Sequence, residues 1–341
     1  MRALAKTDAG PGLELIDVPV PELGPGDVLV QVFAGGVCGT DLHIYQWDAW
    51  ARSRILPPRV IGHEFCGTVA GLGTEVTEVA AGDFVSAEGH VACGRCHSCR
   101  TGSPHICERL QIIGVDRDGG FAEYVAVPAG NVWKLDPSIP RDVAAVMDPL
   151  GNAVHTALQT PLVGKAVAVI GCGPIGLMAI PICHMAGAAL VVASDVAEPR
   201  LALARRMGAD LVLNASAEDV PARIRQATGG RGADVVLEMS GHPRGLRDGL
   251  RALGNGGWVS LLGLPSGPVD IDLANEVIFK EAHLVGIFGR RMWRTWEQAT
   301  ALLRKGLDVT PVITHRLPIE RFEEAFSLLK AATAGKVILY I

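Results

Sequence analysis

The first 150 residues contain short apolar runs that are interrupted by Gly, Pro and Asp. This pattern is typical of short β-strands joined by turns. We expect three of these strands at Asp27–Phe33, Cys66–Ala70 and Phe84–Ser86. The sequence therefore predicts a β-rich N-terminal domain.

From about Lys165 onward, apolar strand patterns alternate with helical patterns. Such an alternation predicts an α/β fold with a doubly wound parallel sheet and right-handed crossovers. The expected strands are Ala166–Ile170, Leu190–Ser194, Val235–Glu238, Trp258–Gly263 and His283–Ile287. The expected helices between the first strands are Ile175–Ala186 and Glu198–Met207.

After Arg290 the pattern predicts an amphipathic helix at Thr295–Arg304, a helix near Ile319–Lys330 and a last strand at Lys336–Tyr340. We expect this tail to return to the N-terminal domain. The expected boundaries are therefore 1–150 with 293–341 for the first domain and 151–292 for the second.

One stretch has the length of a membrane span, because residues 166–194 contain no Lys, Arg, Asp or Glu. Three glycines and a proline interrupt it early, and Pro181 and His184 lie in its middle. Its first five residues are also β-prone. We therefore interpret this stretch as a buried strand, a turn and a helix.

Composition narrows the class of protein. The chain has 341 residues, of which 49% are apolar and 20% are charged, so it can bury two substantial cores. The net charge is −5 with no basic tail, and nothing favours nucleic acid as a partner. We expect the short cluster of Arg290, Arg291 and Arg294 to lie on a solvated or subunit-facing surface. The early charges at Arg2 and Lys6 do not suit a signal peptide, so we expect a cytoplasmic protein whose eight cysteines form no disulfide framework.

Residues 167–176 combine an apolar strand with a G-x-G-x-x-G turn and the start of a helix. In dinucleotide-binding folds the first glycine allows the tight turn, the second lets the backbone approach a pyrophosphate, and the third lets helix and strand pack closely. The corresponding positions are Gly171, Gly173 and Gly176. Asp195 follows 19 residues later, at the end of the next strand, where a carboxylate accepts hydrogen bonds from an adenosine ribose.

This carboxylate favours NAD over NADP, because it would repel a 2′-phosphate. Arg200 lies close by in the sequence, and an arginine there suits a 2′-phosphate, so NADP is the alternative. A structural glycine turn beside a surface aspartate is the non-functional interpretation.

Four cysteines form the spacing C-x₂-C-x₂-C-x₇-C within a Gly-containing loop. Four thiolates at this spacing suit a closed tetrahedral zinc site that braces a loop and leaves no position for substrate. An iron–sulfur cluster and free or disulfide-bonded thiols are the alternatives. The four residues are Cys93, Cys96, Cys99 and Cys107.

A second set of possible metal ligands is weaker evidence for a metal site. Cys38, His63 and Glu64 offer a thiolate, an imidazole and a carboxylate, and Asp148 offers a further oxygen. Three protein ligands and an open position are the arrangement of a catalytic zinc. A lone Cys and a lone His are more often packed core residues, so the argument depends on the dinucleotide turn and the thiolate loop in the same chain.

These motifs together resemble the zinc-dependent medium-chain dehydrogenase family. The run Gly62-His63-Glu64-Phe65-Cys66-Gly67, followed by Gly73 and Val76, matches the zinc signature of that family. The loop 93–107 matches its structural zinc lobe, and 171–176 with Asp195 matches its NAD site. The resemblance covers essentially the whole chain. It implies a Rossmann domain and a GroES-like catalytic domain that carries a zinc lobe, with NAD and one catalytic and one structural zinc per chain.

Longer runs resemble the members of this family that oxidise the C3 hydroxyl of L-threonine. They are 38–45 with Trp47 and Trp50, 86–90, 148–156 and 237–241. This resemblance implies the following roles. Cys38, His63 and Glu64 hold zinc, and Asp148 acts beside it as an exchanging ligand or in proton relay. Thr40 and His43 carry the proton outward. Ile175, Asp195 and Arg200 contact NAD, and Leu262, Gly263, Leu264, Ile287 and Phe288 line the nicotinamide side.

The resemblance leaves three matters open. Glu88, His90 and residues near Trp47–Trp50 are candidates for holding the ammonium and carboxylate of the substrate. A zinc polyol or secondary-alcohol dehydrogenase, acting on sorbitol or 2,3-butanediol, is the alternative enzyme. A non-catalytic NAD sensor or a zinc-stabilised scaffold is the alternative class. The family also suggests a homotetramer, built through the thiolate lobe and the edge strand near His283–Ile287.

Overall fold

The computed structural model describes residues 1–341, which form two compact units. The first unit comprises Met1–Pro149, Arg290–Trp296 and Ile313–Ile341, and the second comprises Leu150–Gly289 and Glu297–Val312. Residues 297–312 thus group with the second unit, whereas the sequence pattern placed the boundary at 293.

The first unit is built around a seven-stranded sheet in which β10, β6, β5, β3, β18 and β17 are successive neighbours and β9 also pairs with β3. A three-stranded sheet, β2-β1-β4, and a two-stranded ribbon, β7-β8, complete it. Its strands are β1 (Arg2–Lys6), β2 (Glu14–Asp17), β3 (Asp27–Val37), β4 (Arg59–Val60), β5 (Glu64–Leu72), β6 (Phe84–Ala87), β7 (His90–Val91), β8 (Gln111–Ile112), β9 (Tyr124–Pro128), β10 (Val132–Lys134), β17 (Ile313–Pro318) and β18 (Lys336–Tyr340).

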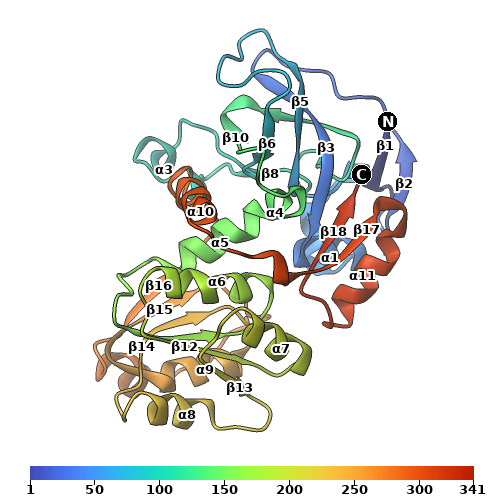
Figure 1. Cartoon of the computed structure of the whole chain (residues 1–341). Coiled ribbons are helices and arrows are strands. Elements are labelled where there is room, and N and C mark those ends of the chain that lie inside the picture. The colour runs from blue at the N-terminus through green and yellow to red at the C-terminus, as the bar shows by residue number, and fades with distance from the viewer. The chain divides into compact units, whose positions relative to one another are not determined.

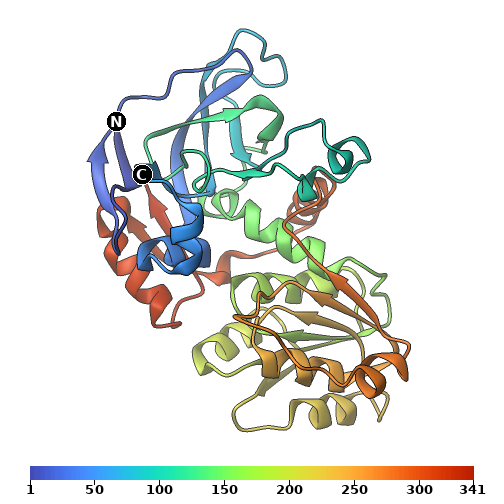
Figure 2. The ribbon, with the colours of Figure 1, turned by 180° about the vertical axis from the view of Figure 1, so that it is seen from behind.

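The helices of this unit are short and lie beside the sheets (Figure 1). They are α1 (Gly39–Gln46), α2 (Ala49–Arg54), α3 (His97–Arg100), α4 (Arg141–Ala145) and α11 (Phe322–Lys330), and α5 (Met147–Ala157) begins in it. A long loop that carries α3 stands out from the sheet and is seen from both sides in Figures 1 and 2.

The N- and C-terminal parts of the first unit share one sheet. β18 pairs with β3 in antiparallel register, with Val337 opposite Val37 and Tyr340 opposite Ala34. Residues of β3 alternate between buried and less buried positions over its first half and are buried throughout Ala34–Val37. The end of β3 therefore lies in the interior of the unit, where the chain next forms α1.

The second unit is a six-stranded parallel sheet with the strand order β13-β12-β11-β14-β15-β16. In chain order this is 3-2-1-4-5-6, the order of dinucleotide-binding doubly wound folds. The strands are β11 (Ala166–Ile170), β12 (Leu190–Asp195), β13 (Leu211–Asn214), β14 (Ala233–Glu238), β15 (Leu253–Leu261) and β16 (His283–Gly286). All five strands predicted from the sequence are present.

Helices cover both faces of this sheet, with α6 on one face and α8 and α9 on the other (Figure 1). They are α6 (Pro174–Met185), α7 (Glu198–Arg206), α8 (Val220–Ala227) and α9 (Pro243–Ala252), with a π-helical turn at Leu273–Ile278 and α10 (Arg294–Arg304) spanning the boundary between the units. Because both faces are covered, β11 is buried at every residue. This explains the long uncharged stretch in the sequence: it consists of β11, the glycine turn, α6 and β12.

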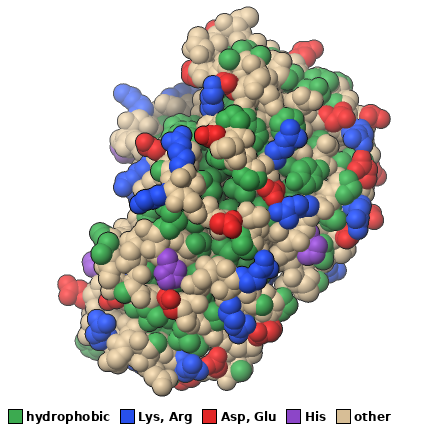
Figure 3. Space-filling view, in the orientation of Figure 1, with side chains coloured by type: hydrophobic (Ala, Val, Ile, Leu, Met, Phe, Trp, Pro, Cys, Tyr) green, Lys and Arg blue, Asp and Glu red, His purple; other side chains and the backbone are tan.

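None of the helices has the length and apolarity that crossing a membrane requires. On the face shown in Figure 3, cationic and anionic side chains are interspersed.

Candidate metal centres and dinucleotide site

Cys38 lies at the junction of β3 and α1, where it is the N-cap residue of the helix. Its backbone N–H donates to Oδ2 of Asp41, 2.9 Å away in the first helical turn. A carboxylate at this position also interacts favourably with the helix dipole. The buried Asp41 side chain therefore fixes the backbone of Cys38 at the point where the strand ends.

Glu64 is the first residue of β5, which runs antiparallel to β3, and His63 directly precedes it. Glu64 is paired with Gly36, so the beginning of β5 is next to the end of β3. Gly62, just before His63, has a φ of 96°, and a Cβ there would lie 2.5 Å from the Phe121 ring. The antiparallel register and this tight approach bring His63 and Glu64 to Cys38.

The donor atoms of Cys38, His63 and Glu64 all lie within 4.8 Å of one another. Oε1 of Glu64 is 2.6 Å from Nζ of Lys336, whereas its buried Oε2 has no hydrogen-bond partner. Burial opposes protonation of His63, but Asp41 and Cys38 outweigh that effect and raise its pKa well above the ordinary value. One sulfur, one nitrogen and one carboxylate oxygen thus lie close enough together to bind a single metal ion.

A second buried network surrounds Arg290. Its Nε donates to Oε2 of Glu88 at 2.8 Å, its Nη2 contacts Oε1 of the same carboxylate, and Nη2 is also 2.8 Å from Oδ2 of Asp148. The indole N–H of Trp296 donates to Oε2 of Glu88 at 2.7 Å. Burial alone would raise the pKa of Glu88, but Arg290 outweighs it and lowers that pKa.

Four buried carboxylates gather in this region, and they are those of Asp41, Glu64, Glu88 and Asp148. Two buried cations, Lys336 and Arg290, face three of them. Burial raises the pKa of Glu64 and of Asp148 even against the attraction of those cations. The region therefore carries an excess of acidic groups that a further cation would stabilise.

This donor set fits a zinc ion. Thiolate, imidazole and carboxylate are the ligand types of catalytic zinc, and three of them leave a position for a substrate oxygen. Oε2 of Glu64 is buried without a hydrogen-bond partner, and a bound cation would supply one.

Asp148 is not one of the three converging donors, but it lies close to His63. Its Oδ2 and the Cβ of His63 both lie within 3.6 Å of the position that a Cβ would occupy on Gly89. Asp148 is 4% exposed, and its carboxylate is held by Arg290.

The four cysteines of the projecting loop converge on one point. The Sγ atoms of Cys96 and Cys99 are 3.4 Å apart, and those of Cys96 and Cys107 are 3.8 Å apart. All are free thiols, and tetrahedral zinc with Zn–S bonds of about 2.3 Å places its sulfurs about 3.8 Å apart. Backbone N–H groups, first that of Arg95, lower the pKa of Cys93 to about 6, while desolvation and neighbouring thiols raise that of Cys99 to about 12. A divalent cation would stabilise all four as thiolates, so this site fits a structural zinc.

The three glycines of the dinucleotide turn differ in their surroundings. Gly171 has a φ of 99°, and a Cβ there would lie 2.6 Å from the Ser240 nitrogen. A Cβ on Gly176 would collide with the Gly171 carbonyl oxygen, and a Cβ on Gly173 would meet nothing within 4 Å. The turn is therefore closed at its first and third glycines and open at the second, where the start of α6 can receive a pyrophosphate.

Asp195 closes this turn from the end of β12. Its Oδ2 accepts the Cys172 N–H at 2.8 Å, and its Oδ1 accepts the N–H groups of Val196 and Ala197. Nη1 of Arg200 lies 3.8 Å from Oδ2 of Asp195. Three backbone N–H groups thus hold the carboxylate beside the turn, and the arginine that would suit a 2′-phosphate already faces it.

The other residues predicted to contact the cofactor follow the carboxyl ends of neighbouring strands. Leu262, Gly263 and Leu264 follow β15, and Ile287 and Phe288 follow β16. Ile175 lies in the first turn of α6. In open parallel sheets the ligand binds outside the carboxyl ends of the strands, which is where all of these residues lie.

Thr40 and His43 both lie on α1, directly after Cys38. Oγ1 of Thr40 is 4.0 Å from Sγ of Cys38, and the side chain of His43 is 56% exposed. The helix thus extends from the metal donors to the surface.

Two of the residues predicted to bind the ammonium and carboxylate groups of the substrate do not suit that role. Both oxygens of Glu88 are engaged by Arg290 and Trp296, so this carboxylate is not free to bind an ammonium group. Burial, reinforced by Arg290, lowers the pKa of His90 to about 3, so His90 is neutral and offers no charge to a carboxylate. Trp47 is buried under Nζ of Lys6, while Trp50 remains 39% exposed.

The prediction that Arg290 lies on a surface was wrong, although Arg291 and Arg294 are exposed. Arg290 is 3% exposed because two carboxylates from distant parts of the chain surround it. Lys336 was also missed as a site residue. The only signal for it was a lone lysine at the start of an otherwise apolar strand.

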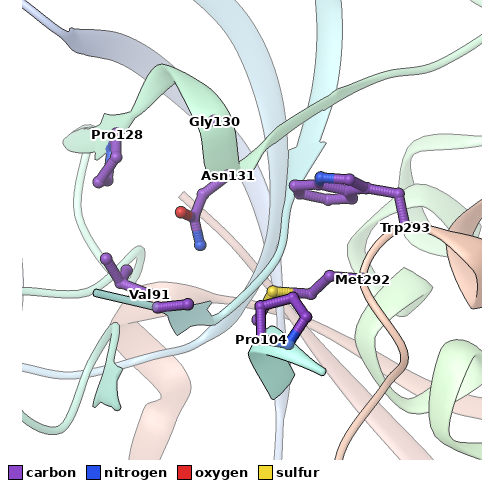
Figure 4. A pocket seen from close by; sticks show the side chains of 8 residues that line it. Val91, Pro104, Pro128, Gly130, Asn131, Met292 and Trp293 are labelled. Atoms are coloured by element: carbon purple, nitrogen blue, oxygen red, sulfur yellow. The ribbon is translucent and has the colours of Figure 1, made fainter. Parts of the chain in front are cut away.

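A pocket of about 340 Å³ is lined on one side by Val91, the residue that follows His90 in β7 (Figure 4). Asn131 lines it and donates from Nδ2 to the carbonyl oxygens of Glu88 and His90. Met292 and Trp293 form the opposite side, and Trp293 stacks on Trp133 with ring centroids 5.5 Å apart. Its lining contains no titratable side chain, so the pocket supplies no acid–base chemistry.

Comparison with known proteins finds a matching domain family for each half of the chain. Residues 24–137 match the alcohol dehydrogenase GroES-like domain, and residues 174–305 match the zinc-binding dehydrogenase domain. L-threonine 3-dehydrogenase of Symbiobacterium thermophilum is 51% identical over 99% of this chain and 97% of that protein. The enzyme of the same name from Bacillus subtilis is 48% identical over 99% of this chain and 98% of its own length.

Among solved structures, 2R,3R-butanediol dehydrogenase from Bacillus subtilis superposes with a TM-score of 0.90 at 27% identity. The match covers 100% of this chain and 99% of that one.

Proposed function

Because this chain belongs to the zinc-dependent medium-chain dehydrogenase family, we propose that it oxidises the C3 hydroxyl of L-threonine with NAD⁺. The products are 2-amino-3-oxobutanoate, NADH and a proton. The observation that carries the proposal is the convergence of Cys38, His63 and Glu64 within 4.8 Å, in a chain that also has the glycine turn. The substrate is assigned from the full-length similarity to L-threonine 3-dehydrogenases.

Cys38, His63 and Glu64 hold the catalytic zinc in this proposal, and Cys93, Cys96, Cys99 and Cys107 hold the structural one. When bound, zinc polarises the C3 hydroxyl as a Lewis acid, and NAD⁺ accepts the hydride that C3 loses. Lys336 keeps one oxygen of Glu64 occupied and leaves the other for the metal. The first unit thereby contributes a fixed set of donors whose orientation does not depend on substrate.

The hydroxyl proton leaves through α1. Thr40 lies beside Cys38, and His43 lies one turn further on with its ring in solvent. Imidazole accepts and releases protons near neutral pH, so it suits the last step of a relay to water.

Asp148 acts beside the metal donors, where Arg290 holds its carboxylate. An oxygen held by a cation is available for a second interaction through its other lone pairs. This supports a part in ligand exchange or in proton relay next to His63.

The second unit holds NAD. Gly173, whose side is open, would receive the pyrophosphate, and Asp195 would accept hydrogen bonds from the adenosine ribose. The pairing of Arg200 with Asp195 supports NAD rather than NADP, because the carboxylate would repel a 2′-phosphate. Residues 262–264, 287 and 288 line the nicotinamide side.

We further propose a homotetramer. β16 has one strand neighbour and forms an edge of the parallel sheet. Several large apolar side chains in β16 and in the segments before and after it in the sequence are exposed: Leu273, Ile278, Phe279, Leu284 and Phe288. An exposed apolar patch beside a free strand edge is a typical subunit interface. The eight free thiols support a cytoplasmic location.

The test compares NADH formation from L-threonine, sorbitol and 2,3-butanediol, with NAD⁺ and with NADP⁺, before and after a zinc chelator. We expect a kcat/KM for L-threonine with NAD⁺ at least about 100-fold above every other pair, and its loss with the chelator. A preference for either polyol would replace threonine with the alternative substrate class. Undiminished turnover after complete removal of zinc would refute the assignment of the metal site.

A further inference from the structure

His43 is hydrogen-bonded to a carboxylate that no motif singled out. Its Nδ1 is 2.6 Å from Oδ2 of Asp48, which lies two residues beyond the end of α1. The backbone N–H of Asp48 also donates to the carbonyl of His43 at 3.4 Å. The connection between α1 and α2 thus places the carboxylate against one specific nitrogen of the imidazole.

The two oxygens of Asp48 have separate partners. Oδ1 accepts the N–H of Ala51 at 3.0 Å and caps α2, whereas Oδ2 faces His43. The Ala51 N–H, together with His43, lowers the pKa of Asp48, so the carboxylate is ionised whenever His43 exchanges protons. The cap also fixes the carboxylate, which as a result cannot follow the imidazole if the ring turns.

An ionised carboxylate at Nδ1 determines which nitrogen is basic. It accepts a hydrogen bond, so Nδ1 carries the proton and Nε2 is left as the acceptor. The edge of Trp50, with its centroid 6.1 Å from that of His43, limits the ring on another side. The imidazole is therefore held in one tautomer and one orientation although half of it is in solvent.

We propose that Asp48 is a positioning residue for proton release: it orients His43 so that Nε2 receives the proton that leaves through Thr40. This inference rests on the proposed function, in which His43 carries that proton. The proton moves from the C3 hydroxyl through Thr40 to Nε2 and then to water, and Asp48 itself is neither protonated nor consumed. An aspartate that orients a histidine in this way recurs in hydrolase triads.

The test uses Asp48→Asn, because Asn caps a helix as well as Asp but lacks the charge that holds Nδ1–H. We expect the single-turnover rate of NADH formation from L-threonine to fall about 10-fold, below the ~10²-fold loss expected on removing a proton-transfer group. The KM values for threonine and NAD⁺ and the melting temperature should stay unchanged. Asp48→Ser, which also retains a capping oxygen, should behave in the same way.

Asp219→Asn is the matched control. Asp219 caps α8 through the Ala222 N–H at 3.0 Å and has no histidine partner. Its replacement changes charge and cap chemistry equally and should leave the single-turnover rate as in the parent. A loss of rate in this variant equal to that of Asp48→Asn would attribute the effect to charge alone and overturn the proposal.

The double variant of His43→Gln and Asp48→Asn distinguishes the role of Asp48 from that of His43. If His43→Gln lowers the single-turnover rate and Asp48→Asn then has no further effect in that background, Asp48 acts through His43. If the losses multiply, or if Asp48→Asn alone has none, the positioning role is overturned while the relay stands. If His43→Gln leaves the rate unchanged, the relay of the proposed function fails, and the inference about Asp48 fails with it.

Discussion

Single residues determine the charge balance around the metal donors. Lys336 reaches Glu64 from a strand 272 positions later in the chain, and Arg290 reaches Glu88 across 202 positions. Burial would lower the pKa of Lys336, but Glu64 more than compensates and raises it. Removing one partner of such a buried pair leaves an unpaired charge and costs about 3–5 kcal/mol.

Cys38→Ser should abolish turnover without preventing NAD from binding. The serine hydroxyl is a weaker zinc ligand than a thiolate, and the proposed NAD site lies in the second unit. We expect kcat with L-threonine to fall more than about 100-fold, since even second-shell changes at metal sites cost about 10–100-fold. NADH formation and NAD⁺ titration calorimetry measure the two effects. Cys183→Ala, which alters a buried thiol outside both clusters, is the control. Near-normal turnover in Cys38→Ser would contradict the zinc assignment.

His90 should make the folded protein less stable as the pH falls. Its pKa is about 3 in the folded chain, where burial comes first among the causes, against an ordinary 6.5. Between these values the unfolded chain binds a proton at this position and the folded chain does not. The free energy of unfolding therefore decreases on acidification, by up to about 4–5 kcal/mol over the whole window.

Denaturant unfolding of the parent and of His90→Asn, measured at a series of pH values, tests this linkage. Below about pH 6.5 the variant should show a shallower decline, because Asn does not titrate. The comparison of slopes is independent of the constant loss of contacts in the variant. Parallel curves would show that His90 is protonated in the folded chain.

Sequence patterns identify donors at the residue level only where a motif carries them. The cysteines of the loop and the pair at 63 and 64 have characteristic spacings, and the structure brings each set together. Arg290 has no such signal. Among three arginines in five residues, only the fold shows that one is enclosed by Glu88 and Asp148. Pairing across about 200 positions depends on topology, which local periodicity does not contain.

At the level of elements, the turn between β11 and α6 contains glycines that are needed for two different reasons. Gly176 is required by packing, since its Cβ would meet the carbonyl of Gly171. Gly173 has φ −67° and ψ 176°, a conformation that alanine adopts freely, and open space beside it. Packing therefore does not explain the second glycine, whereas the approach of a pyrophosphate does.

Gly173→Ala should therefore weaken NAD⁺ binding, whereas Gly176→Ala should lower the stability of the fold. We expect Gly173→Ala to keep its melting temperature and to bind NAD⁺ about 10-fold more weakly, or about 1.4 kcal/mol. Gly176→Ala should lose about 1–3 kcal/mol of stability through overpacking. Thermal unfolding without cofactor and NAD⁺ titration provide the two readouts. Unimpaired NAD⁺ binding by Gly173→Ala would place the cofactor elsewhere.

The elements predicted most accurately are those whose hydrophobic pattern is uniform along their whole length. The predicted strand 166–170 is confirmed residue for residue by β11, because burial on both faces makes it uniformly apolar. β13, α8 and α9 were not predicted, and each has an ambiguous pattern. α9, for example, contains two glycines and three arginines, and Lys280 caps its end by donating to the carbonyls of Leu250 and Leu253. Such an element is stabilised by tertiary contacts more than by its own composition.

At the level of the whole molecule, the two donor sets impose different demands on a metal. The four sulfurs of the loop can close a coordination shell, which makes the metal part of the fold. The set at Cys38 includes a carboxylate and leaves a position open, which makes the metal more exchangeable and available to a substrate. Activity and folding should therefore depend on different ions.

Progressive chelation should reveal this difference. We expect the first zinc equivalent per chain to leave together with activity and with little change in the melting temperature, because the donors of the open site are held by β3, β5 and Lys336 without the metal. The second should leave only under stronger chelation and should lower the melting temperature, because the loop then loses the ion that joins its four cysteines. Metal analysis, NADH formation and thermal unfolding on the same samples test the order. Cys93→Ser serves as the matched variant: it should start with about one zinc per chain and a reduced melting temperature. Simultaneous loss of activity and of thermal stability with the first equivalent would contradict the division of roles, since it would mean that one ion supports both the fold and the reaction.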